Sequence, residues 1–115
     1  MSLVAFAGVI MSKYKAVVHY RFKEGMEEKG IHFLENELLK KADTYGAHSI
    51  ELLHSEDDPT LVLGIALWND IQDARRFQAK WAMKEHEMLR YCSQSPKREF
   101  FKIVSAFTER QRKAA

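Results

Sequence analysis

The sequence contains little cysteine, proline or glycine. Its 115 residues include one cysteine, two prolines and five glycines. A single cysteine excludes an intrachain disulfide and any zinc site built from several cysteines. The few glycines form no phosphate-binding loop, which argues against nucleotide binding. A lone thiol is compatible with a reducing compartment, so we expect a cytoplasmic protein.

Long apolar runs are also missing. The run from Leu3 to Met11 spans 9 residues, well below the roughly 20 that cross a bilayer. No basic residue precedes it, unlike in a secretory signal. We therefore expect no membrane partner, and we interpret residues 1–12 as an N-terminal arm or leader segment.

No charge of one sign dominates the chain. It has 18 basic and 16 acidic residues, and 46% of its residues are hydrophobic, as in ordinary globular domains. This balance alone argues neither for nor against a nucleic-acid partner. The one basic cluster lies in a tail at residues 109–115 without interleaved aromatics, so we expect no nucleic-acid partner. Residues 13–108 are long enough for one domain.

The residue types for metal binding and nucleophilic catalysis lack the necessary spacing. The five histidines form neither an HxH pair nor an HExxH motif, and Arg90 stands one helical turn after His86. Cys92 has no histidine three or four positions away. We therefore expect no metal site, and we interpret Cys92 as a small buried side chain.

What the sequence does have is a clear apolar periodicity. Alternation predicts strands over residues 14–22, 47–54, 60–68 and 98–107, and a spacing of three to four predicts helices over 26–45 and 71–93. The strand over 60–68 is apolar on both faces, which is typical of a central strand. Gly46 suits the end of the first helix, and Asp70 suits the N-cap of the second.

This order predicts an α+β protein with a ferredoxin-like β-α-β-β-α-β arrangement. Its four-stranded antiparallel sheet would carry both helices on one face. The last two strands are apolar on both faces, so the second face of the sheet would expose a large apolar patch on a monomer. We therefore expect a homodimer that forms through that face.

Two tryptophans mark a candidate pocket. Trp68 is in phase with the small residues Gly64 and Ala66, which could leave a cavity beneath its indole ring. Trp81 lies on the helical stripe together with Phe77. The alternative for both tryptophans is ordinary core packing, with the indole N–H groups paired to the protein.

Polar candidates lie near these rings. Tyr20 is on the apolar face of its strand, where its hydroxyl could donate a hydrogen bond to a ligand. His86 lies about 120° from the centre of the helical stripe, at 100° per residue. It is either an exposed histidine or a base at the mouth of the pocket. His54, at the end of the second strand, is a weaker version of the same idea.

The segments ALWND (66–70) and FQAKWAMKEHEML (77–89) support a family resemblance. Together with the element order, they make residues 13–108 resemble the dimeric α+β barrel proteins, in particular the antibiotic biosynthesis monooxygenase-like domains. The resemblance implies a dimer whose two sheets form a barrel, with a ligand cavity between sheet and helices in each subunit. It also implies cofactor-independent oxygenation of a phenol or quinol, in which the deprotonated substrate passes an electron to dioxygen.

The resemblance assigns roles to residues of this chain. Trp68 and Tyr20 would orient a hydroxylated aromatic substrate, and His86 or His54 would take its proton. The cavity would be lined further by Leu52, Gly64, Ala66, Phe77 and Trp81. No cofactor is expected, because Gln78 stands ten residues after Trp68, where the haem-degrading branch has a histidine. The alternative is a non-catalytic dimer that binds a small hydrophobic molecule, acts in a stress response or is purely structural.

Overall fold

The computed structural model describes residues 13–107 and confirms the predicted α+β arrangement. Its strands are β1 (Tyr14–Arg21), β2 (Ser49–His54), β3 (Leu61–Trp68) and β4 (Lys97–Lys102), and its helices are α2 (Glu27–Glu37) and α3 (Ile71–Met88). Three single-turn 3₁₀ helices, η1 (Leu39–Lys41), η2 (Asp43–Tyr45) and η3 (Leu89–Tyr91), connect them. The expected arm at 1–12 and tail at 109–115 lie outside the described residues.

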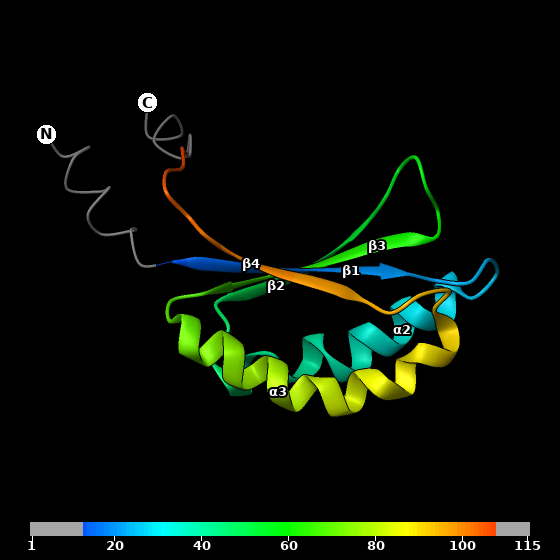
Figure 1. The fold of residues 1–115 in the computed structure, drawn as a ribbon, viewed down its shortest axis with the longest axis horizontal. Helices are drawn as coiled ribbons and strands as arrows, with labels where there is room; N and C mark the ends of the chain where they lie inside the picture. Colours follow the sequence, from blue (N-terminus) through cyan, green and yellow to red (C-terminus); the bar gives the residue numbers. More distant parts are fainter. Residues whose placement is uncertain (1–12, 108–115) are drawn as a thin grey trace, which may run out of the picture.

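The four strands form one antiparallel sheet in the order β2-β3-β1-β4. Both helices pack against the same face of this sheet, as Figure 1 shows. The sheet face that meets the helices is called the inner face below, and the opposite face is the outer face. The central strands β3 and β1 place the largest number of side chains under the helices.

The register of β1 and β3 determines which of their side chains lie together on the inner face. Tyr20 pairs with Val62, Val18 with Gly64, and Ala16 with Ala66. Along β3 every second residue, from Val62 to Trp68, is buried. Because side chains alternate across a strand, this pattern confirms that Trp68 lies in phase with Gly64 and Ala66 on the inner face.

The first helix is shorter than predicted. Regular α-helix ends at Glu37, and the hydrogen bonds then change to the tighter i to i+3 pattern, as from the Lys41 N–H to the Leu38 carbonyl at 3.2 Å. The apolar stripe continued through this stretch in the sequence, and no proline or glycine signalled the change. Gly46 ends it as expected, with a left-handed φ of 90° that glycine adopts without strain.

The second helix begins as predicted and ends early. The Asp70 carboxylate accepts a hydrogen bond from the Gln72 N–H at 2.8 Å, which confirms the N-cap. The α-helix ends at Met88, and the 3₁₀ turn η3 carries the chain to Cys92, where the backbone becomes extended.

The last strand is also shorter than the predicted range of 98–107. Lys102 pairs with Tyr14, the first residue of β1, and the Ile103 N–H still bonds to the Lys13 carbonyl at 3.0 Å. Beyond that point β1 offers no further partner among the described residues. Val104 and Phe107 are accordingly highly exposed.

The outer face has no covering element among residues 13–107, and Figure 1 shows no helix on that side. The side chains of Leu61, Leu63, Ile65 and Leu67 from β3 are half-buried there. Leu53 and Phe101, on the flanking strands, are exposed. None of the helices in residues 13–107 has the length and apolar character to span a membrane.

Candidate functional site

A mostly apolar cavity lies between the inner face of the sheet and α3. Strands β1, β2, β3 and β4 supply its floor, α3 supplies its roof, and Leu38 closes one side. The lining residues are Ala16, Val18, Tyr20, Leu38, Ile50, Gly64, Ala66, Trp68, Ala74, Phe77, Gln78, Trp81, Arg98 and Phe100.

The cavity is narrow. The space that the centre of a water molecule can reach is about 40 Å³. One buried water needs roughly 10–15 Å³ of such space, and a cavity that binds one benzene ring is about 150 Å³, so this cavity is the size of a few waters and a single aromatic ring already requires some side-chain movement. A substrate with two or three fused rings requires side chains of the lining to move.

Small residues create this space. Gly64 lies in the floor on β3, and a Cβ atom added there would stand 3.2 Å from Cε2 of Tyr20 and 3.7 Å from Cδ2 of Leu52. Ala66 and Ala16, which pair across β3 and β1, continue the floor toward Trp68. Larger side chains at these positions would fill the cavity.

Aromatic rings form the roof and the ends of the cavity. The ring of Phe77 lies between the two tryptophans, with its centroid 5.5 Å from that of Trp68 and 6.4 Å from that of Trp81. The indole N–H of Trp81 donates a hydrogen bond to the Tyr20 hydroxyl at 3.2 Å. The two tryptophans therefore do not fill the space by packing against each other, because Phe77 separates them.

Tyr20 is a neutral hydrogen-bonding group inside the cavity wall. Burial raises the pKa of its hydroxyl well above the usual value, and the negative charge of Glu85 raises it further. The hydroxyl oxygen accepts from Trp81, while its proton has no acceptor among residues 13–107. Tyr20 thus cannot act as a base near neutral pH, but it can donate one hydrogen bond to a ligand.

Trp68 carries the second unused donor. Its side chain is 1% exposed, and its indole N–H has no hydrogen-bond partner among the described residues. A buried donor without an acceptor costs roughly 1–3 kcal/mol. The Trp68 ring lines the cavity, but its N–H is itself enclosed, so an oxygen-bearing ligand would reach this donor only after neighbouring side chains move.

An ion pair that the sequence analysis missed lies beside Tyr20. Arg98 of β4 lines the cavity and donates a hydrogen bond to the carboxylate of Glu85 on α3. Glu85 is 7% exposed and is the one charged residue among the buried side chains of the described chain. Its position was readable from the helical stripe, because it lies four residues after Trp81 and three before Met88.

The structure brings six of the nine predicted site residues to the cavity: Tyr20, Gly64, Ala66, Trp68, Phe77 and Trp81. Leu52 packs against the core next to it without lining it. His54 is exposed, and its Nε2 atom lies 2.7 Å from the Pro59 carbonyl. His86 is exposed in a surface depression on the far side of Glu85.

Gln78 was not among the predicted site residues, because the sequence analysis noted it only where the haem-degrading branch has a histidine. In the structure its side chain is half-buried and lines the cavity. No group of three or more metal-ligating side chains comes together in the part of the chain that the structure describes. Cys92 is a free, buried cysteine in the same core cluster as Tyr20, and burial raises the pKa of its thiol. We therefore assign neither a metal nor a thiolate to the site.

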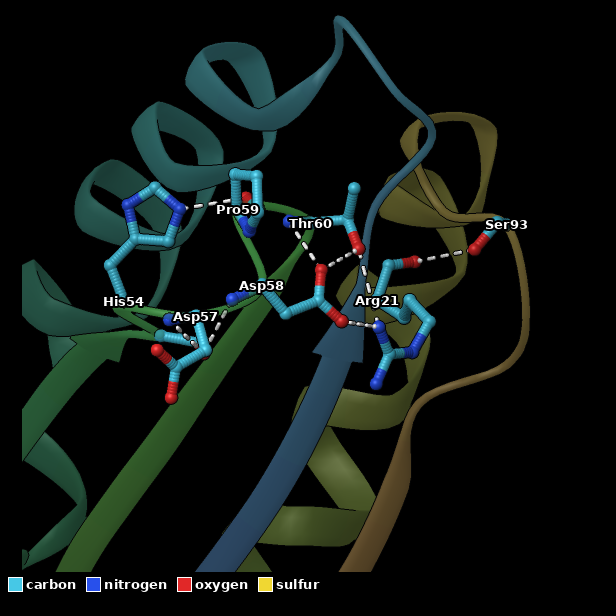
Figure 2. Close-up of polar contacts among 8 residues, drawn as sticks. Arg21, His54, Asp57, Asp58, Pro59, Thr60 and Ser93 are labelled. Carbon is cyan, nitrogen blue, oxygen red and sulfur yellow. Dashed lines mark hydrogen bonds and ion pairs between the residues drawn. The ribbon is translucent and has the colours of Figure 1, made fainter.

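A second polar cluster lies at the turn between β2 and β3, as Figure 2 shows. The Asp58 carboxylate accepts hydrogen bonds from the Arg21 guanidinium, from the Thr60 hydroxyl at 2.7 Å and from the Thr60 N–H at 3.1 Å. The Arg21 carbonyl accepts from the Ser93 hydroxyl at 3.3 Å. Both carboxylate oxygens of Asp58 are used within the protein, so we interpret the cluster as a connection between the turn, β1 and the segment after α3.

Comparisons with known proteins identify the fold. No family model and no curated protein matches the sequence. A monooxygenase of Streptomyces coelicolor from the gene ActVA-Orf6, solved with the ligand nanaomycin D, matches with a TM-score of 0.74 and 19% identity, over 90% of this chain and 97% of that chain.

Other solved structures agree. An antibiotic biosynthesis monooxygenase matches with a TM-score of 0.69 and 15% identity, over 80% of this chain and 99% of that one. The NE2512 protein of Nitrosomonas europaea, of unknown function, matches with a TM-score of 0.71 and 19% identity, over 87% and 97% of the two chains. These matches confirm the monooxygenase-like resemblance at the level of the fold. At such identities they leave the activity open.

Proposed function

We propose that the protein is a cofactor-independent monooxygenase that oxidises a hydroxylated aromatic compound in the cavity between the sheet and α3. The observation that supports this most strongly is the combination of an apolar cavity with two buried, unused donors, Tyr20 O–H and Trp68 N–H. Ligand sites combine an apolar lining with few polar groups in this way. The shared fold with proteins named as monooxygenases adds support.

The proposed chemistry balances without a cofactor. The phenol gives its proton to water before it enters the cavity, and the phenolate gives one electron to dioxygen to form a phenoxyl radical and superoxide. The two radicals combine at a ring carbon, the peroxide formed takes up a proton from water, and loss of water leaves a quinone. One oxygen atom enters the product and the other leaves as water, so phenol and dioxygen give quinone and water.

The chain would contribute shape, dryness and hydrogen bonds to this reaction. The apolar walls exclude water from the radical pair, which protects it from side reactions. Tyr20 and Trp68 would orient oxygen atoms of the substrate, and Phe77 and Trp81 would contact the face of its ring. The proposal gives His86 and His54 no step, because neither side chain lines the cavity.

The two donors belong to opposite ends of the site. Tyr20 pairs with Val62, which precedes Trp68 by six residues in β3. At roughly 3.4 Å per residue the two Cα positions are about 20 Å apart along the sheet. The proposal therefore assigns the two side chains to different parts of the cavity wall.

We further propose that the outer face of the sheet is the interface of a homodimer. Its support is the row of half-buried leucine and isoleucine side chains on β3 together with the exposed Phe101 and Leu53. A row of apolar side chains left uncovered in the middle of a sheet favours a partner, and its charged neighbours Lys15, Glu51 and Glu99 would lie at the edge of that contact. The free, buried thiol of Cys92 is compatible with a reducing environment, so the proposal places this dimer in the cytoplasm.

The activity is tested by measuring oxygen uptake with a panel of naphthols, anthrones and catechols under ¹⁸O₂. The proposal expects uptake above the uncatalysed rate and one labelled oxygen atom in the product. Tight binding of these compounds without uptake would instead support the non-catalytic binding protein. If no compound of the panel binds and none causes oxygen uptake, both the monooxygenase and the non-catalytic binding protein are contradicted.

A further inference from the structure

We propose that the cleft between α3 and the end of α2 is the entrance to the cavity and a binding site for an acidic group of the ligand. The ring of the ligand would pass Phe77 into the cavity, while a carboxylate would stay outside among lysine side chains. This inference rests on the proposed function for the aromatic character of the ligand. It adds the entrance, the residue that controls it and a second chemical group of the ligand.

This cleft, called the vestibule below, shares a wall with the cavity. Its lining includes Phe77 and Trp81 together with the charged side chains of Glu37, Lys41, Lys80 and Lys84. The space in it that the centre of a water molecule can reach is about 340 Å³. Among the described residues, Phe77 and Trp81 are the two that line both spaces. Their rings are parallel within 6°, with centroids 6.4 Å apart, so the pair forms the wall between vestibule and cavity.

Phe77 is the part of this wall that can move at the lower cost. Trp81 is 6% exposed and donates a hydrogen bond to the Tyr20 hydroxyl, so its displacement would break a buried hydrogen bond. The Phe77 side chain is half-buried, and its hydrocarbon ring has no donor or acceptor. Its ring contacts with Trp68 and Trp81 would be replaced by contacts with the ring of the ligand. A rotation of Phe77 would therefore join the narrow cavity to the vestibule.

Lysine side chains lie beside this wall. Lys80 follows Phe77 by three residues, and Lys84 follows Trp81 by three. Residues three apart are neighbours on the surface of a helix, so each ring has a lysine next to it. Lys41 lines the same vestibule from η1. A ligand held against the two rings would thus lie within reach of ammonium groups from two elements.

Two of these lysines already face one carboxylate oxygen. The Nζ atoms of Lys41 and Lys84 lie 3.1 Å and 3.6 Å from the same atom, Oε1 of Glu37. An ammonium group carries three donors, so this contact leaves donors for a second carboxylate. Glu87, at 3.5 Å from Lys84, is the other acidic residue of the lining. The lining therefore sets three lysines against two glutamates, and a ligand carboxylate would balance the remaining positive charge.

The two spaces suit different parts of one molecule. The cavity is mostly apolar, and a carboxylate inside it would lose its hydration without gaining a partner. In the vestibule a carboxylate keeps water on one side and meets lysines on the other. Exposed ion pairs each contribute little energy. The expected effect is thus a several-fold preference for an acidic ligand.

The test compares 2-naphthoate with 2-naphthamide, which has the same rings and no charge. Neither compound is a phenol, so isothermal titration calorimetry measures binding without turnover. The naphthoate should bind roughly fivefold tighter at low ionic strength, as expected for exposed ion pairs. High salt should reduce this preference, because salt screens exposed charges. Equal binding of the two compounds by the wild type, or no binding of either, would overturn the proposal.

The charge variants are Lys41→Gln and Lys84→Gln, with Lys40→Gln as the matched control. Lys40 is the exposed neighbour of Lys41 on η1 and does not line the vestibule. Each of the first two variants should remove at least half of the preference for the naphthoate, and Lys40→Gln should leave it unchanged. An equal loss in Lys40→Gln would show a general effect of protein charge and would overturn the acidic-group site.

Phe77→Ala tests the entrance by stopped-flow kinetics, followed by tryptophan fluorescence because Trp81 lines both spaces. Removal of the ring should open the wall and raise the association rate of the uncharged 2-naphthamide at least fivefold. Phe33→Ala is the matched control, because Phe33 contacts Trp81 but lines neither space. An unchanged rate in Phe77→Ala, or an equal rise in Phe33→Ala, would overturn Phe77 as the entrance.

The wild-type comparison keeps the proposal falsifiable if a variant does not fold. A preference for the naphthoate without oxygen uptake from any phenol of the panel would contradict the proposed monooxygenase and leave this inference standing. Oxygen uptake without that preference would contradict this inference alone.

Discussion

The indole N–H of Trp81 donates a hydrogen bond to the hydroxyl of Tyr20 at 3.2 Å, across 61 residues of sequence. Both side chains are buried, so this bond ties α3 to the central strand β1 inside the core. It also fixes the ring of Tyr20 at the end of the cavity. The same contact therefore serves packing and the shape of the candidate site.

Replacement of Tyr20 by phenylalanine should destabilise the protein. The change removes the acceptor and leaves the Trp81 N–H buried without a partner, which costs roughly 1–3 kcal/mol. Urea denaturation measures the loss. Tyr14→Phe is the control, because Tyr14 lies on the same strand, is half-buried and has no hydrogen-bonded hydroxyl among the described contacts. Equal losses in both variants would contradict the proposed role of the bond.

Gly30→Ala should destabilise the protein although it lies in a helix. An alanine in place of a helical glycine usually stabilises by about 0.5–1 kcal/mol. At this position a Cβ atom would overlap the ring of Phe22, which is almost fully buried. Overpacking of this kind costs roughly 1–3 kcal/mol or more.

The melting temperature of Gly30→Ala shows directly whether the substitution stabilises or destabilises the protein. Lys29→Ala, at the exposed neighbouring position, should change it little. A rise in the melting temperature of Gly30→Ala would show that the helix and the Phe22 ring separate without cost.

Asp58→Asn should remove part of the stability that the protein loses in acid. Hydrogen bonds from Arg21, and then from Thr60, lower the pKa of Asp58 from 3.8 to about 2. A carboxylate whose pKa is lower in the folded state stabilises the fold above its unfolded pKa, and this contribution disappears as the pH falls through the folded value. The gap in melting temperature between wild type and variant should therefore shrink from pH 4 to pH 2.

Asp57→Asn is the matched control for this experiment, since Asp57 is the exposed neighbour in the same turn (Figure 2). The difference in melting temperature between Asp57→Asn and the wild type should not narrow from pH 4 to pH 2. A constant gap for Asp58→Asn would mean that the Arg21 contact contributes nothing in solution.

Ile65→Glu should convert the proposed dimer to a monomer. The side chain lies in the middle of the outer face, beside Val17 and Glu51. A carboxylate there would be buried in the interface without a partner, which is strongly unfavourable. Sedimentation equilibrium measures the change.

Met83→Glu, on the exposed side of α3, is the control for the interface and should leave the assembly unchanged. A wild-type protein that sediments as a monomer would remove the proposed interface. So would an Ile65→Glu variant that remains a dimer.

The sequence was informative where a residue's chemistry and its periodicity agreed. The alternation in β1, the N-cap at Asp70 and the stop at Gly46 each combine a local pattern with a residue suited to it, and all three are confirmed. The floor of the cavity was also predictable, because Gly64 and Ala66 share the phase of Trp68. These features depend on neighbours in the chain and not on distant contacts.

Prediction was weaker where distant contacts decide the outcome. The end of α2 at Glu37 has no local stop signal, and the end of β4 is set by its partner β1. The predicted buried stripe of the second helix contained only apolar residues, although the spacing of Glu85 from Trp81 fits that stripe. Its partner Arg98 lies on another element, so only the folded chain shows why the charge is tolerated.

The most direct test of the account compares oxygen uptake by the wild type, Trp68→Phe and His86→Ala with an anthrone as substrate. Trp68→Phe keeps an aromatic ring and removes the unused donor, whereas His86→Ala changes an exposed side chain off the cavity. The account predicts uptake by the wild type, a loss of at least tenfold in Trp68→Phe and full activity in His86→Ala. Uptake at the uncatalysed rate in all three, or a loss confined to His86→Ala, would contradict catalysis in this cavity.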